Sequence, residues 1–153
     1  MTTQLRAALS AALEVEHQVV YGYGVAGAHL VHRRDRTAAL RRLAEHQELR
    51  DALAAAVSAA GGVPAVAAPA YALPFPVTDQ VGAARLAVRL EDATAGACWD
   101  VVAAAPAKSS GRRLAVPALA AAATWALHWR ALAPAAAPPP ALPGQPTKPN
   151  QPG

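Results

Sequence analysis

The chain has 153 residues, a formal net charge of +4 and a single cysteine, Cys98. This length suits one domain with one core, and alanine-rich composition with few aromatic side chains favours close-packed helices over a sheet. One cysteine excludes an intrachain disulfide, residues 1–14 lack the pattern of a signal peptide, and the longest apolar run is too short to span a bilayer, so we expect a cytoplasmic protein.

The first half of the chain predicts two long helices. Residues 3–31 form the first, because apolar side chains and Glu16 recur there at steps of three and four. The second begins near Asp35 or Thr37 and runs to about residue 60, where Gly61 and Gly62 end it. Its expected buried face consists of Ala39, Leu43, His46, Arg50, Leu53 and Val57.

Residues 61–77 are predicted to be a crossover connection. The segment contains four prolines and is therefore neither helix nor central strand. Seventeen extended residues span about 55 Å, whereas a 25-residue helix is about 37 Å long. The connection can therefore return along the whole bundle, so that the second and third helices run parallel. Tyr71, Leu73 and Phe75 alternate and place one side of the segment on the helices.

Two more helices and a tail complete the prediction. Residues 79–105 form the third helix, with Thr78 or Asp79 as its cap, and its buried face includes Glu91 and Cys98. Residues 112–133 form the fourth helix, with Trp125 and His128 on its expected buried face. We therefore expect a helical domain over residues 1–133 and a Pro-rich disordered tail over residues 134–153.

Each of the four predicted helices has one metal-ligand type of side chain in or near its buried face. In chain order they are Glu16, His46, Glu91 and His128. Bundles with a di-metal centre take a Glu from two helices and a Glu-x-x-His pair from the other two. Here Leu43 and Trp125 stand at the positions of the two additional carboxylates.

The sequence also resembles a known family. The stretches at residues 13–17, 20–25, 71–79 and 90–93 are similar to an actinobacterial ferritin-like family catalogued as domain of unknown function 4439. The resemblance implies an all-α, ferritin-like four-helix bundle with a long crossover between helices 2 and 3, and it implies no activity. It also implies that Glu16, His46, Glu91 and His128 occupy the metal-ligand positions of the bundle. Leu43 and Trp125 differ from this pattern, because they stand three residues before the two histidines, where a carboxylate is expected.

Arg50 is the expected counter-charge in the core. With the first helix–helix turn near residues 33 and 34, Glu16 lies opposite Arg50 or Asp51, and His46 is offset by roughly 7 Å at 1.5 Å per residue. A buried carboxylate must be paired, protonated or metal-bound. We therefore predict a buried polar network of Glu16, Arg50, Glu91, His128 and His46.

Two hypotheses about function follow. The first is a binding or structural bundle with a degenerate di-metal site and no cofactor. The alternative is a mononuclear metal-binding protein or metal-dependent oxidoreductase, in which Glu16, His46, Glu91 and His128 hold iron or manganese.

The partners are less defined by the sequence. Five arginines gather near the first turn, and we interpret them as a solvated helix end rather than a nucleic-acid site, although an acidic partner is the alternative: Arg33, Arg34, Arg36, Arg41 and Arg42. Flat, Ala- and Gly-rich faces favour a homodimer. The sequence indicates no membrane partner and does not identify a small-molecule ligand.

Overall fold

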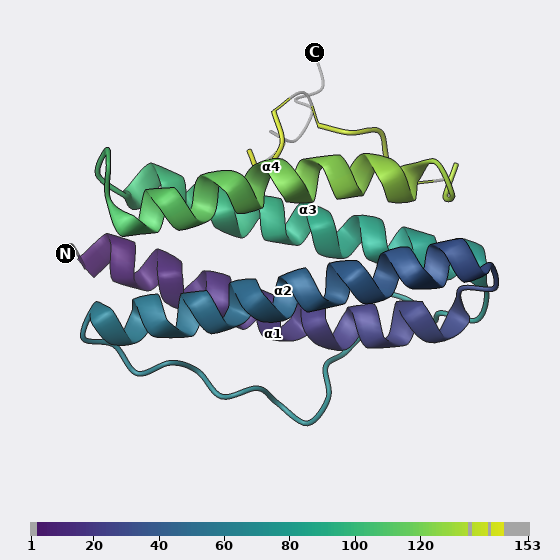
Figure 1. Cartoon of the computed structure of the whole chain (residues 1–153), viewed down its shortest axis with the longest axis horizontal. Coiled ribbons are helices and arrows are strands. Elements are labelled where there is room, and N and C mark those ends of the chain that lie inside the picture. The colour runs from purple at the N-terminus through teal and green to yellow at the C-terminus, as the bar shows by residue number, and fades with distance from the viewer. Residues whose placement is uncertain (1–2, 135, 141, 146–153) are drawn as a thin grey trace, which may run out of the picture.

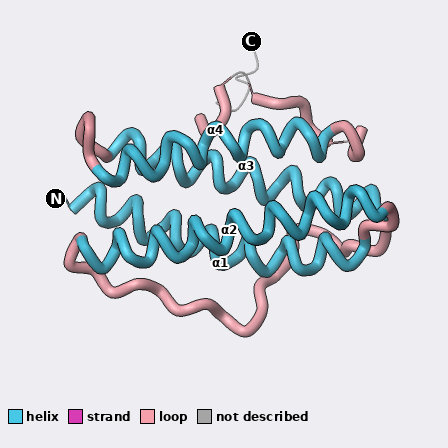
Figure 2. Tube along the Cα trace, in the orientation of Figure 1, coloured by secondary structure: helices cyan, strands magenta, loops and turns pink. Residues whose placement is uncertain are grey.

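The chain forms a four-helix bundle in the computed structural model, which describes residues 3–134, 136–140 and 142–145 (Figure 1). The helices are α1 (Thr3–His29), α2 (Arg33–Ala59), α3 (Gln80–Ala104) and α4 (Ser110–Arg130). These described residues contain no strand (Figure 2), which confirms the predicted all-α bundle. Within the same ranges, no helix combines the length and the apolar character needed to cross a bilayer.

The connection between α2 and α3 is a long crossover, as the prolines predict. It leaves one end of the bundle and returns to the other, so that α2 and α3 run in the same direction (Figure 1). Its side chains alternate between partly buried and exposed from Tyr71 to Val77. The Tyr21 and Tyr71 rings meet edge to face at 5.7 Å, and the His17 Nε2 atom lies 2.9 Å from the Ala65 carbonyl oxygen. These contacts hold the crossover against α1.

Local sequence signals explain most helix ends. The Asp79 carboxylate accepts a hydrogen bond from the Gly82 amide and caps α3, and the Ser109 hydroxyl accepts one from the Arg112 amide and caps α4. Gly61 adopts a φ of 74° just after α2, a conformation that favours glycine. The predicted start of α2 was wrong: the helix begins at Arg33, and Asp35 is buried in its first turn.

The core has an apolar part and a polar part. At the end of the bundle that holds the start of α1, the buried side chains are all apolar or sulfur-containing, and the largest are Leu5, Leu9, Leu13, Leu53, Val57 and Val101. Toward the other end, a second apolar cluster is built around Tyr23, Leu86 and Trp129. Between these clusters lie Glu16, His46 and Glu91, each at most 1% exposed. Charged groups therefore occupy the middle of the bundle.

The segment after α4 is the Pro-rich part of the chain that the sequence predicts to be a disordered tail. Its described residues, 134, 136–140 and 142–145, run back over α4 and α3 (Figure 1). The Arg130 Nε donates a hydrogen bond to the Ala137 carbonyl oxygen at 2.8 Å. The remaining residues of the predicted tail, 135, 141 and 146–153, lie outside the described residues.

Candidate functional site

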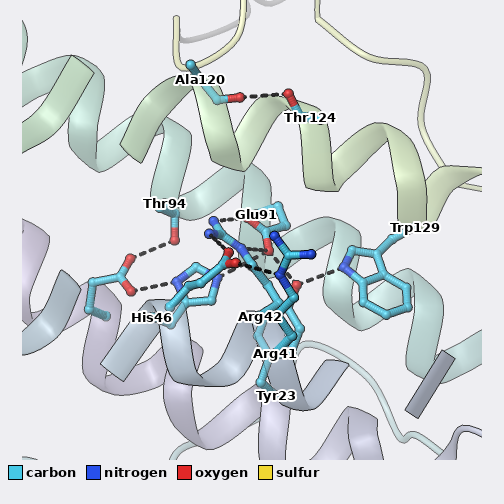
Figure 3. A network of polar contacts seen from close by, with 11 residues as sticks. Tyr23, Arg41, Arg42, His46, Glu91, Thr94, Ala120, Thr124 and Trp129 are labelled. Carbon is cyan, nitrogen blue, oxygen red and sulfur yellow. Dashed lines mark hydrogen bonds and ion pairs between the residues drawn. The ribbon is translucent and has the colours of Figure 1, made fainter. Parts of the chain in front are cut away.

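Glu91 of α3 is the centre of a buried ion network (Figure 3). The Arg42 guanidinium of α2 donates from Nε to Oε1 and from its NH2 group to Oε2, both at 2.8 Å. This two-pronged geometry matches a planar guanidinium to a planar carboxylate and is among the strongest ion pairs available to a protein. The third nitrogen of Arg42 donates to Glu45 at 3.0 Å, at the edge of the bundle.

His46 joins Glu91 to a second buried carboxylate. Its Nε2 lies 3.1 Å from Glu91 Oε1, and its Nδ1 lies 2.8 Å from Glu16 Oε2 on α1. Both ring nitrogens face carboxylate oxygens, and this arrangement is satisfied when the imidazole donates from both nitrogens and carries a positive charge. The Thr94 hydroxyl donates to the other Glu16 oxygen at 2.7 Å. Both oxygens of Glu16 therefore have a hydrogen-bond donor.

Two aromatic side chains extend the network to α4. The Tyr23 hydroxyl donates a short hydrogen bond to Glu91, and the Trp129 indole Nε1 donates to the Tyr23 oxygen at 2.8 Å. Tyr23 lies two turns after Glu16 on α1, so one face of that helix contributes two members of the network. All four helices thereby contact one continuous set of hydrogen bonds, in which Glu91 alone accepts four.

Mutual pairing determines the ionisation of these groups. Burial lowers the pKa of His46, but the hydrogen bonds and charges of Glu16 and Glu91 outweigh it, and the pKa is raised above 6.5. Burial raises the pKa of Glu91, yet Arg42 and His46 outweigh it, and the pKa falls below 4.5. The positive charges of Arg42 and His46 therefore face the negative charge of Glu91 in the core.

Neither Tyr23 nor Cys98 is an activated nucleophile. Burial, followed by the charge of Glu91, raises the pKa of Tyr23 well above 10. Burial, followed by the charge of Glu16, raises the pKa of Cys98 to about 12. Both groups are therefore protonated at neutral pH, and a thiol without thiolate character is unreactive.

The predicted role of Arg50 was wrong, because Arg42 occupies the core position. Arg50 pairs with the neighbouring Asp51 at 2.8 Å, and that carboxylate is 70% exposed. Arg42 and Arg50 lie one helical turn before and after His46, so both are compatible with its face of α2. The signal that favours Arg42 is its place in the recurring buried positions Asp35, Ala39, Arg42 and His46.

The position of the first turn explains the error. With α1 ending at His29 and α2 beginning at Arg33, the turn is centred on residue 31. Glu16 is then 15 residues before this centre (31 − 16) and His46 is 15 residues after it (46 − 31), so the two are level. The expected offset of His46 came from placing the turn two to three residues too late.

His128 was also predicted to lie in the network and does not. It is exposed and contacts the rings of Trp125 and Trp129, with the His128 and Trp129 centroids 4.7 Å apart. The buried face of α4 passes through Ala122, Ala126 and Trp129, one residue later than expected. Sequence reasoning therefore found Glu16, His46 and Glu91 but missed the parts of Arg42, Thr94, Trp129 and Tyr23 in the network.

The donor set does not fit a di-iron or di-manganese centre. Arg42 occupies both oxygens of Glu91, and each nitrogen of His46 faces a carboxylate rather than a common open position. Leu43 and Trp125 bring apolar side chains where two more carboxylates would be needed. Across residues 3–134, 136–140 and 142–145, no three His, Cys, Asp or Glu side chains are arranged to hold a metal ion.

The arginines near the first turn have individual roles. Arg36 donates to the carbonyl oxygens of Leu30 and Val31 just after α1, and Arg41 pairs with Glu45 on the surface. Arg42 is buried in the network. The interpretation as a solvated helix end was wrong for Arg42, whose side chain lies in the core.

Comparison with known proteins places the chain in a family. Residues 8–147 match the family model described as Domain of unknown function (DUF4439). The chain belongs to this family. A crystal structure of a conserved hypothetical protein, Rv2844 from Mycobacterium tuberculosis, is 35% identical and superimposes with a TM-score of 0.78, covering 86% of this chain and 99% of that one. A search of the curated proteins finds no match.

Proposed function

We propose that this DUF4439 chain is a ferritin-like bundle with a degenerate di-metal site and a binding or structural role rather than a catalytic one. The observation that carries the proposal is the two-pronged pairing of Arg42 with Glu91. A guanidinium at this place supplies the positive charge that metal ions would otherwise bring to the carboxylates. The ligand types Glu16, His46 and Glu91 at mid-bundle, together with the crossover, support the ferritin-like relationship.

The network has a structural consequence that fits this role. α2 packs mainly against α1 and meets α4 at few positions. Arg42 spans that interface, because its guanidinium lies 6.0 Å from the Trp125 ring centroid while its nitrogens pair with Glu91. A buried charge set that is satisfied in only one arrangement selects one register of the four helices.

Metal content tests the proposal directly. Full-length protein is produced in medium supplemented with iron and manganese, purified without chelator and analysed by elemental mass spectrometry. We expect far less than one metal atom per chain. Stoichiometric iron or manganese that is lost in Glu91→Gln, but retained in the exposed control Glu48→Gln, with unchanged circular dichroism in both, would overturn the proposal in favour of the metal-binding alternative.

The proposed location and partner are the cytoplasm and a second copy of the chain. A free, buried Cys98 supports a reducing compartment. Gly24 and Gly27 support close approach of another helix, because a Cβ at either position would meet no heavy atom within 4 Å. Light scattering is expected to give twice the chain mass at micromolar concentration, and a monomer mass throughout that range contradicts the homodimer.

A further inference from the structure

The groove between α3 and α4 on the outer side of the bundle is occupied by the chain's own Pro-rich segment. Arg130 at the end of α4 donates from Nε to the Ala137 carbonyl oxygen, and its NH2 group pairs with Asp92 of α3 at 2.7 Å. Arg130 is therefore oriented by one helix while it binds the backbone of the segment. A contact to a backbone carbonyl does not depend on the side chain of the bound residue.

Gly144 shows that the segment fits the groove closely at one point. Its φ is +86°, and a Cβ added there would lie 2.5 Å from the Ala95 carbonyl oxygen and 2.8 Å from the Trp99 Cβ. Only a residue without a side chain can approach the α3 backbone in this way. The glycine is thus required by the groove and not merely by a turn.

The rest of the contact is incompletely packed. A cavity of about 460 Å³ remains between the segment and α3, lined by Asp92, Gly96 and Asp100 together with Pro138 and Pro140. A second cavity of about 200 Å³ lies over Ala123, Ala126 and Leu127 of α4. Both spaces are partly open to solvent, so the segment is held at two points and is not sealed into the core.

We propose that this α3–α4 groove is a docking site for an extended, uncharged, Pro-rich peptide from another protein, with residues 134, 136–140 and 142–145 as the described occupant in the free chain. The chemistry of the seated segment defines the chemistry of the partner. Prolines restrict the unbound peptide and so lower the entropy lost on binding, and small groove residues such as Ala95, Gly96 and Ala126 admit a backbone closely. Arg130 supplies the backbone contact, and the cavities provide room for side chains of the partner.

A tethered segment competes with any free peptide, because its effective concentration is on the order of millimolar. Gly144→Val places a branched side chain against Ala95 and releases the tethered segment. The probe is a fluorescent peptide with the sequence of residues 134–147, titrated into full-length protein. We expect at least about tenfold tighter binding to Gly144→Val than to wild type.

Four controls make the result specific. Ala11→Val, at an exposed position of α1 outside the groove, is expected to bind the peptide as wild type does. A peptide with valine in place of its glycine is expected not to bind, and Arg130→Ala in the Gly144→Val background is expected to weaken binding. Gly144→Ala is a smaller change at the same place and is also expected to bind the peptide more tightly than wild type does. The result then does not depend on the folding of one variant.

Equal affinity for wild type and Gly144→Val, or equal binding of the valine peptide, would overturn the proposal. Wild-type dimers in light scattering that become monomers in Gly144→Val would also overturn it. In that case the groove would belong to the same segment of a second copy.

Discussion

The apolar end of the bundle and its charged middle stabilise the same four helices in different ways. Around Leu53 and Val57, the side chains contribute by burial alone, and any well-packed apolar set of similar volume would serve. Around Glu91, the contribution depends on each donor meeting its acceptor, because an unpaired charge in this position is strongly unfavourable. The apolar end therefore tolerates repacking, whereas the middle requires one specific arrangement.

Arg42→Ala is expected to have the largest effect on this contrast. It leaves Glu91 buried without its main counter-charge, and the cost of breaking a buried pair is about 3–5 kcal/mol of unfolding free energy. Urea denaturation measures the loss. Arg41→Ala is the matched control, because its side chain is 75% exposed on the adjacent position. A loss for Arg42→Ala as small as that for Arg41→Ala would show that the network contributes little.

Leu53→Ala is the corresponding change at the apolar end. The side chain is 1% exposed, so its truncation removes buried surface and leaves a cavity at a cost of about 3 kcal/mol. The loss is expected to be the same at pH 5.5 and pH 8.5, because this cluster contains no group that titrates in that range. A loss that changed with pH would mean that the two parts of the core are coupled.

The pH dependence of stability is expected to come from the charged middle. Since the folded pKa of His46 is raised above 6.5, its stabilisation is complete below pH 6.5 and is lost as pH rises through the folded value. Since the folded pKa of Glu91 is below 4.5, its stabilisation is present above pH 4.5 and is lost as pH falls through the folded value.

The difference in unfolding free energy between wild type and His46→Gln is therefore expected to be greatest between pH 4.5 and 6.5 and smaller at pH 8.5. Denaturation of both proteins at several pH values measures it. A difference that stayed constant across this range would show that His46 does not carry a charge in the folded protein.

Arg50→Ala is expected to have the smallest effect. Arg50 pairs with an exposed carboxylate, and exposed pairs contribute little, so the change in unfolding free energy should stay within about 0.5 kcal/mol. Arg50 and Arg42 have the same chemistry on the same helix, eight residues apart (50 − 42). A loss of unfolding free energy comparable to that of Arg42→Ala would instead indicate that Arg50 lies in the core.

Local signals in the sequence were sufficient for the architecture. Helix periodicity, Gly61 after α2, the caps at Asp79 and Ser109, and the prolines of the crossover act within a few residues. They therefore determine the number of helices, their approximate limits and the parallel course of α2 and α3. Glu16, His46 and Glu91 could be placed in the core because each lies on a strongly periodic apolar face.

Only the tertiary structure decided which other groups complete the network. The buried face of a helix is wide enough for either of two neighbouring positions on each turn, such as Arg42 or Leu43 and His128 or Trp129. Helix propensity does not decide which of the two is buried. An error of two or three residues in a turn shifts the partner helix by several ångströms, at 1.5 Å per residue on each side. Hydrogen bonds tolerate much less than that. The sequence by itself therefore determined the bundle and its three central ionisable residues, whereas contacts between helices selected Arg42 and placed His128 outside.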